Sequence, residues 1–248
     1  MEIKDLQDEF AGLLYSIDNF LKSNLEAETK LLQELKKEPL DNLNLNVSNT
    51  LFTQILKLHE EGKTKAEIKT ALIPLKQTVG RQVRDFNSKM RAGREIKTCL
   101  EKYTKEQLAE FETVYAETLR VYHPLITLTV DQINITTFNM LRRFYMYSNI
   151  DSFYGLFKEH PITLHEIKDE EKAKETYEKN IKLYKEQFEK LKSDKRYTNI
   201  KNVVSDEALI AREEAAIRQA NYKLKQKFED LKKQIAAAYP EGIDDIIK

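Results

Sequence analysis

Apolar side chains in the first 35 residues recur every three or four positions, and no other feature constrains the fold as strongly. This spacing places them along one stripe of an α-helix. The positions are Leu6, Phe10, Leu13, Ile17, Phe20, Leu25, Leu32 and Leu35. Similar spacing returns along most of the chain, and only 6 glycines and 5 prolines among 248 residues are present to interrupt it. The sequence therefore predicts an all-α protein, folded as a helical bundle.

The charges of the chain cancel, because 41 Lys and Arg residues balance 41 Asp and Glu residues. Nucleic-acid binding usually leaves a basic excess, so we expect no nucleic-acid partner. No apolar run approaches the roughly 18 residues that a membrane helix needs. The first ten residues, MEIKDLQDEF, lack the basic and apolar order of a signal peptide. We therefore expect a cytoplasmic protein without a membrane partner.

Basic residues gather between positions 81 and 94. They are Arg81, Arg84, Lys89, Arg91 and Arg94. Such a cluster could form a phosphate-binding face. The basic residues are spread around the predicted helix and alternate with core positions, which favours a solvated or salt-bridged surface.

Proline and capping residues predict where several helices begin and end. The first helix ends before Pro39, because the residue preceding a proline is disfavoured in a helix. Residues 40–50 alternate leucine or valine with asparagine, and we interpret them as an extended connector. Thr64 and Thr104 each lie three residues before a Glu or Gln, which is the spacing of a capping box. Pro74 either bends the helix that follows Thr64 or starts it anew.

Apolar residues after position 168 follow the spacing of a coiled-coil seam, with steps of four and three from Tyr177 to Leu191. A second seam runs from Ile210 to Ile235 after a polar break. Two such helices most simply form an antiparallel coiled-coil hairpin over residues 168–239, and the seams would also allow a homo-oligomer. With this hairpin, the sequence divides into an N-terminal helical region over 1–100, a helical pair over 101–160 and the C-terminal hairpin.

No familiar enzyme motif is present. The six glycines lie far apart, so none can build a phosphate loop. The lone cysteine, Cys99, has the surroundings of a buried packing residue. His160 and His165 are separated by Pro161, which disrupts the spacing of a metal-binding pair on a helix. We therefore expect a protein without enzymatic activity, bound metal or cofactor.

A tyrosine lies eight residues before the histidine of a His-Pro pair, as Tyr115 precedes His123 and Pro124. The helix predicted after this corner ends in an aromatic pair, Phe144-Tyr145, followed by a short turn. With these residues, the segment over about 104–156 resembles a J-domain, the helical-hairpin module of DnaJ-type co-chaperones. The resemblance implies two antiparallel helices with the His-Pro corner at their tip.

Leu125 departs from that family, whose His-Pro-Asp loop has an aspartate there that engages and stimulates a heat-shock ATPase. The helix before the corner is also acidic, whereas the family's binding face is typically basic. The resemblance thus implies a degenerate J-domain: a co-chaperone or adaptor that has lost ATPase stimulation and whose partner is a heat-shock ATPase or a larger assembly. The residues that it implies for partner binding are Arg120, His123, Pro124 and Leu125.

Two other functions stay open. The helical seams would suit a structural or assembly subunit of a larger bacterial or viral complex, in which the His-Pro corner only ends a helix. An enzyme with an unrecognised helical active site would instead show a pocket in which Tyr115, Tyr145 or Glu117 converges on His123.

Overall fold

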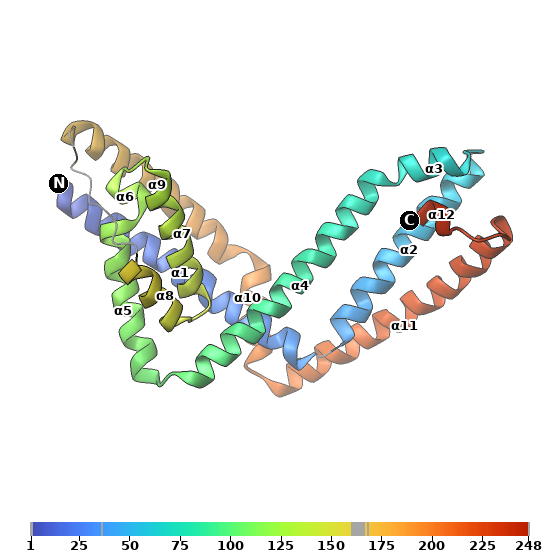
Figure 1. The fold of residues 1–248 in the computed structure, drawn as a ribbon. Coiled ribbons are helices and arrows are strands. Elements are labelled where there is room, and N and C mark those ends of the chain that lie inside the picture. The colour runs from blue at the N-terminus through green and yellow to red at the C-terminus, as the bar shows by residue number, and fades with distance from the viewer. Residues whose placement is uncertain (1, 36, 160–166, 168, 248) are drawn as a thin grey trace. The chain divides into compact units, whose positions relative to one another are not determined.

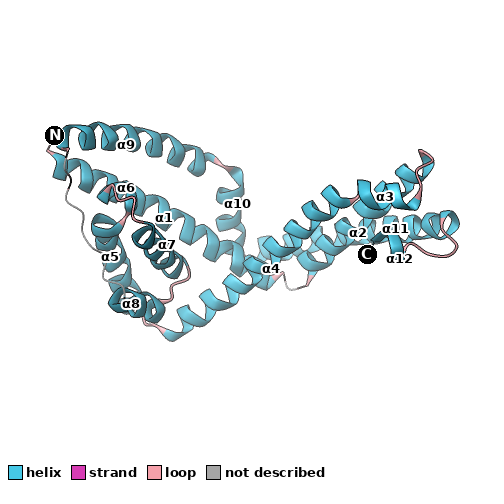
Figure 2. Cartoon of the chain, turned by 45° about the horizontal axis from the view of Figure 1, so that its top comes forward, coloured by secondary structure: helices cyan, strands magenta, loops and turns pink. Residues whose placement is uncertain are grey.

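The computed structural model describes residues 2–35, 37–159, 167 and 169–247, and these residues form helices joined by short loops, with no strand among them (Figures 1 and 2). The all-α prediction is therefore confirmed. The helices are α1 (Ile3–Glu34), α2 (Glu38–Glu60), α3 (Lys65–Ala71), α4 (Ile73–Lys102), α5 (Lys105–Tyr122), α6 (Pro124–Thr127), α7 (Gln132–Met146), α8 (Ile150–Glu159), α9 (Glu170–Ser193), α10 (Lys195–Val204), α11 (Glu207–Ala238) and α12 (Asp244–Ile247).

The chain divides into two compact units, and this division differs from the three consecutive regions that the sequence suggested. Unit 1 comprises residues 1–30 and 91–202, and unit 2 comprises residues 31–90 and 203–248. The helices expected to form the hairpin over 168–239 fall in different units, since α9 belongs to unit 1 and α11 to unit 2. Each of their apolar faces is covered by a helix from the first quarter of the chain, α9 by α1 and α11 by α2.

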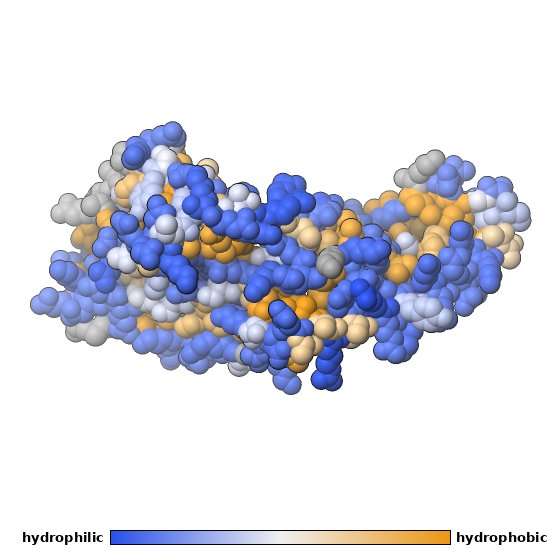
Figure 3. Space-filling model, turned by 90° about the horizontal axis from the view of Figure 1, so that it is seen from below, coloured by the Kyte–Doolittle hydropathy of each residue, from blue (hydrophilic) through white to orange (hydrophobic). Residues whose placement is uncertain are grey.

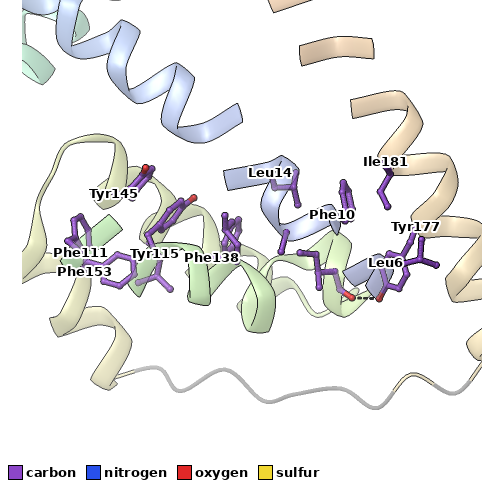
Figure 4. Close-up of a cluster of buried hydrophobic side chains, with 14 of the residues drawn as sticks. Leu6, Phe10, Leu14, Phe111, Tyr115, Phe138, Tyr145, Phe153, Tyr177 and Ile181 are labelled. Atoms are coloured by element: carbon purple, nitrogen blue, oxygen red, sulfur yellow. Dashed lines mark hydrogen bonds between the residues drawn. The ribbon is translucent and has the colours of Figure 1, made fainter. Parts of the chain in front are cut away.

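Unit 1 is built around a core shared by α1, α5, α6, α7, α8 and α9 (Figure 4). The fully buried aromatic rings in it are Phe10, Phe111, Tyr115, Phe138, Tyr145, Phe153 and Tyr177. The rings of Tyr177 and Tyr184 on α9 pack against Phe10 on α1, at centroid distances of 6.5 and 5.5 Å. Burying such large rings is the main favourable contribution to the stability of the unit.

Unit 2 is built on a parallel pair of helices, α2 and α11. The Asn42 side chain donates to Asn221 Oδ1 at 2.9 Å, and the rings of Phe52 and Phe228 stack at 5.4 Å. Contacts thus advance along both helices in the same direction. The short helices α3 and α12 complete the core at the far end of the pair; its buried residues are Ile55, Leu58, Ile68, Leu72, Ile235, Tyr239, Ile243 and Ile246.

The interpretation of residues 40–50 as an extended connector was wrong, since they form the first half of α2. Asparagine has a modest helix propensity, but packing can override such a preference. Asn42 and Asn49 lie toward α11, where the Asn49 side chain donates to the Leu224 carbonyl at 3.0 Å. The asparagines that resembled loop residues are therefore the polar part of a helix–helix contact.

The predicted helix starts are confirmed where capping residues indicated them. Thr64 with Glu67 and Thr104 with Gln107 both form reciprocal capping boxes, at the starts of α3 and α5. Pro74 lies in the first turn of α4, where a missing amide hydrogen has little cost. The helix that follows Thr64 therefore ends at Ala71 and starts anew.

Polar and charged side chains dominate the face drawn in Figure 3, and the apolar residues on that face form separate patches. Among the described residues, no helix combines the length and apolar character needed to cross a membrane.

Candidate functional site

The His-Pro corner lies between two antiparallel helices of unit 1. Tyr115, in the middle of α5, stacks on Tyr145 near the end of α7, whereas His123, after the end of α5, packs on Phe138 in the first half of α7. A residue later in the chain near α5 thus contacts a residue earlier in α7, so the two helices are antiparallel. This is the arrangement expected for the helix pair, and it places residues 123–131 at one end of it.

His123 caps the helix that follows it. Its Nδ1 accepts a hydrogen bond from the Leu125 amide at 3.2 Å, and its carbonyl accepts from the Ile126 amide at 2.8 Å. Pro124 occupies the first helical position of α6, where its fixed φ suits a helix. Leu128 ends this short helix in the left-handed conformation, with a φ of 52°. The corner is therefore a closed and internally bonded turn.

The imidazole of His123 is turned toward the core. It packs edge-on against Phe138 with a centroid distance of 4.7 Å. Burial lowers the pKa of His123 to about 4, against an ordinary value of 6.5. The ring is therefore neutral at pH 7, which agrees with Nδ1 acting as an acceptor. His123 thus serves as a capping and packing group in this state.

The other residues of the predicted partner site differ in exposure. Arg120 is exposed at the end of α5, and its Nε lies 3.5 Å from a carboxylate oxygen of Asp8 on α1. Leu125 is partly buried and packs against the core of unit 1. Two apolar side chains beside the corner are more exposed than any of these four, Val130 at 93% and Ile133 at 72%.

An ion pair with a buried carboxylate joins α1 to the helix pair, and sequence reasoning did not find it. Asp18 of α1 is only 4% exposed and accepts hydrogen bonds from three donor groups. The Tyr115 hydroxyl donates to it at 2.6 Å. The Nε of Arg142 lies 2.9 Å from both carboxylate oxygens. Three helices are thereby joined at one carboxylate, since Tyr115 comes from α5 and Arg142 from α7.

A second carboxylate, Glu112 of α5, gathers a similar set of donors one turn away. It pairs with the buried Lys22 of α1 and accepts from the hydroxyl of Tyr145 on α7. The Tyr15 hydroxyl donates to the same carboxylate at 3.2 Å. Lys22 Nζ also lies 4.6 Å from the centroid of the Tyr145 ring, a cation–π contact.

These tyrosines are hydrogen-bond donors and not acids. Burial, reinforced by the adjacent carboxylates, raises the pKa of both Tyr115 and Tyr145 far above the ordinary value of 10. Neither ring is exposed to solvent. Neither tyrosine therefore shares an open pocket with His123, which is the arrangement that an enzyme would have required.

A signal for the buried pairs was present in the sequence. Asp18 and Lys22 lie four residues apart within the apolar stripe of the first helix, on the same side as Leu14 and Leu25. Charged residues on a buried stripe are rare unless they are paired. Their partners come from other helices, and a single sequence does not show which ones.

No metal site emerges from the residues that the structure describes, since no three His, Cys, Asp or Glu side chains there could hold an ion together. His160 and His165 lie outside the described residues. Cys99 is buried in α4, and burial raises the pKa of its thiol. Its placement confirms the prediction of a packing residue.

Comparisons with known proteins identify no relative. No family model matches the chain, and no curated protein or solved structure matches it. The resemblance to a J-domain therefore stands on Tyr115, His123, Pro124 and the helix pair that carries them.

Proposed function

We propose that this chain is a non-enzymatic adaptor of the J-domain type, which binds a protein partner at the corner between α5 and α7 and has lost ATPase stimulation. The observation that carries the proposal is the antiparallel α5–α7 pair, stacked through Tyr115 and Tyr145, with His123-Pro124 at its tip. A J-domain would require this arrangement of these residue types.

The corner has properties that suit protein binding. The hydrogen bonds of His123 hold the turn in one conformation, so little ordering is needed when a partner binds. Val130 and Ile133 expose apolar surface that a partner would cover. Arg120, held near Asp8, adds a charged rim to this surface.

Loss of ATPase stimulation is supported by the residue after the proline. Leu125 has no carboxylate with which to engage an ATPase, and its side chain packs inward against the core. Glu110 and Glu117 are exposed on α5, so this helix presents acidic groups where the family presents basic ones. These acidic groups would disfavour the contact on α5 through which the family stimulates its ATPase, so binding would depend on the apolar surface of Val130 and Ile133.

The proposal is tested with a purified heat-shock ATPase of the kind that J-domains stimulate. We expect the chain to bind it in biolayer interferometry without increasing ATP turnover. The variant Val130→Ser/Ile133→Ser should weaken binding at least tenfold, whereas Leu183→Ser, an exposed apolar position on α9, should leave it unchanged. The proposal would be wrong if the unmodified chain did not bind the ATPase, or if it increased the ATP turnover of that enzyme.

The variant Leu125→Asp asks whether the corner still has the geometry of a J-domain. An aspartate there lies in the first turn of α6, where the helix dipole favours a carboxylate, provided that the side chain turns out of the core against which Leu125 packs. We expect it to restore part of the stimulation, and a matched Leu125→Asn variant to restore none. Equal turnover with both variants would mean that the corner is not J-domain-like.

The alternative is an assembly subunit, favoured by the exposed ring of Tyr222 on α11. Light scattering separates the two functions, because a subunit of this kind should self-associate at micromolar concentration. A monomer that binds the ATPase would support the adaptor.

A further inference from the structure

A cationic groove lies between α3 and α4 in unit 2. It encloses about 540 Å³ and is lined by Lys69, Thr70, Ile73, Lys76, Gln77 and Arg84. Three of these six side chains are positively charged, and none is a carboxylate. Because like charges repel, such a grouping favours an anionic ligand.

The cations of the groove contrast with others in the same unit. Lys65 pairs with Glu241, and Arg218 pairs with both Glu38 and Glu214. Lys69 and Arg84 are exposed, and among the described residues neither makes an ion pair. The local charge of the groove is therefore not neutralised by the fold.

Two contacts fix the positions of basic groups that line the groove. An Nη atom of Arg84 lies 3.5 Å from where a Cβ on Gly80 would be, so the guanidinium folds back along α4 toward its N-terminal end. Lys76 Nζ donates to the Ile246 carbonyl of α12 at 2.9 Å, which fixes the ammonium group beside α12. Lys76 and Arg84 are thereby held within about two turns of each other on α4.

An apolar side chain lies among the cations. Ile73 is 49% exposed at the start of α4, although it is a large hydrophobic residue. A nucleic-acid backbone would place phosphates against it without any favourable contact. Three cations are also fewer than the about four to eight that usually bind an anionic membrane surface. A peptide segment can supply both an apolar side chain and carboxylates at this scale.

We propose that this groove binds an acidic segment of a protein partner, with an apolar side chain of that segment packed on Ile73 and its carboxylates paired with Lys69 and Arg84. Lys76, already bonded to the backbone of α12, adds to the positive potential. The groove lies in unit 2 and the His-Pro corner in unit 1, so this site is independent of the function proposed for the corner.

The test uses the full chain and a fluorescein-labelled peptide of about twelve residues, rich in Glu, with Leu at every fourth position. Fluorescence anisotropy should show binding that weakens as salt rises, because the paired charges are exposed. The variant Lys69→Glu/Arg84→Glu should lower affinity at least tenfold. A matched control, Lys232→Glu/Lys233→Glu on the exposed side of α11, should change it less than twofold.

A second variant tests the apolar contact and avoids the charged groups. Ile73→Ser should weaken binding of the Leu-containing peptide about fivefold, and should leave a peptide with Ser at those positions unaffected. Circular dichroism should show unchanged helix content in all variants, since the substituted side chains are exposed.

Several outcomes would overturn the proposal. Equal affinity in the Lys69→Glu/Arg84→Glu variant would mean that the peptide binds elsewhere. Comparable binding of a Lys-rich peptide would show that charge is not recognised. A single-stranded oligonucleotide or an anionic lipid vesicle that binds more tightly than the peptide, and is lost in the same variant, would assign the groove to that ligand instead.

Discussion

The rings of Tyr115 and Tyr145 lie parallel, with their centroids 3.6 Å apart and their planes 5° from each other. Their hydroxyls point to different carboxylates, Asp18 for Tyr115 and Glu112 for Tyr145. The stacked pair thus connects two buried ion pairs, and it fixes the distance between α5 and α7 at the level of α1. We expect the stability of unit 1 to depend strongly on this arrangement.

Replacing Tyr115 with Phe removes the hydroxyl and keeps the ring. Asp18 would retain Arg142 as its partner, so the cost is that of one charged hydrogen bond, about 2 kcal/mol in the free energy of unfolding. Urea denaturation followed by circular dichroism measures the change. Tyr222→Phe, at an exposed ring on α11, is the control and should have no effect. An equally stable Tyr115→Phe protein would show that the bond to Asp18 adds nothing.

Replacing Arg142 should lower the free energy of unfolding more than replacing Tyr115, because the loss of Arg142 leaves the buried Asp18 carboxylate without a counterion. The variant Arg142→Met keeps most of the apolar stem and should destabilise the protein by about 3 kcal/mol. Adding Asp18→Asn removes the stranded charge and should recover part of that loss. If the two changes were simply additive in the same denaturation experiment, the ion pair would not be coupled.

The pH dependence of stability should report the burial of His123. Its pKa is about 4 in the folded state and near 6.5 when exposed, so the unfolded chain takes up the proton first as the pH falls. The contribution of the neutral ring is complete above pH 6.5 and is lost between pH 6.5 and 4. Because the ring is partly exposed, we expect a loss of about 2 kcal/mol across this window.

A matched variant isolates that contribution from the carboxylates that titrate in the same range. Asn at position 123 can still accept the bond from the Leu125 amide, as a good N-cap residue does, but it does not titrate. His123→Asn should therefore be less stable at pH 7, through loss of the contact with Phe138, and should lose less stability toward pH 4. Parallel profiles for the two proteins would contradict the burial of the neutral ring.

The helices were predictable wherever a local signal specified them. The apolar stripe gave α1, and the capping boxes at Thr64 and Thr104 gave the starts of α3 and α5. The first half of α2 was missed because its asparagines resemble loop residues until α11 lies beside them. The pairing of helices was also missed. The helices α9 and α11 have similar apolar seams, and the sequence does not specify the helix against which each seam packs.

The position of the candidate site could be predicted from the sequence, but the contacts of its side chains could not. Tyr115 eight residues before His123 indicated that the tyrosine shares the buried face of the helix before the corner. The inward rotation of the imidazole depends on Phe138, which is 15 residues further along the chain. The ion pair of Asp18 with Arg142 joins residues 124 positions apart. Contacts of that range arise only after the chain has folded.

The Asn42–Asn221 contact should set the alignment of α2 with α11. Besides accepting from Asn42, Asn221 donates to the Glu38 carbonyl at 3.0 Å, so it bonds to α2 at two points. A buried polar pair of this kind favours one register, because a shifted helix would leave its groups unpaired. Asn221→Ala leaves both partners on α2 unsatisfied and should reduce the free energy of unfolding by about 2 kcal/mol.

Replacing both asparagines with leucine separates stability from register. Asn42→Leu/Asn221→Leu removes the Asn42 amide that Asn221→Ala leaves unpaired, and should be more stable than Asn221→Ala in urea denaturation. Its register should be less well defined, which a cysteine pair introduced at exposed positions of α2 and α11 can measure through crosslinking at more than one spacing. A double variant that crosslinks only at the original spacing would show that Phe52 and Phe228 are sufficient to fix the alignment.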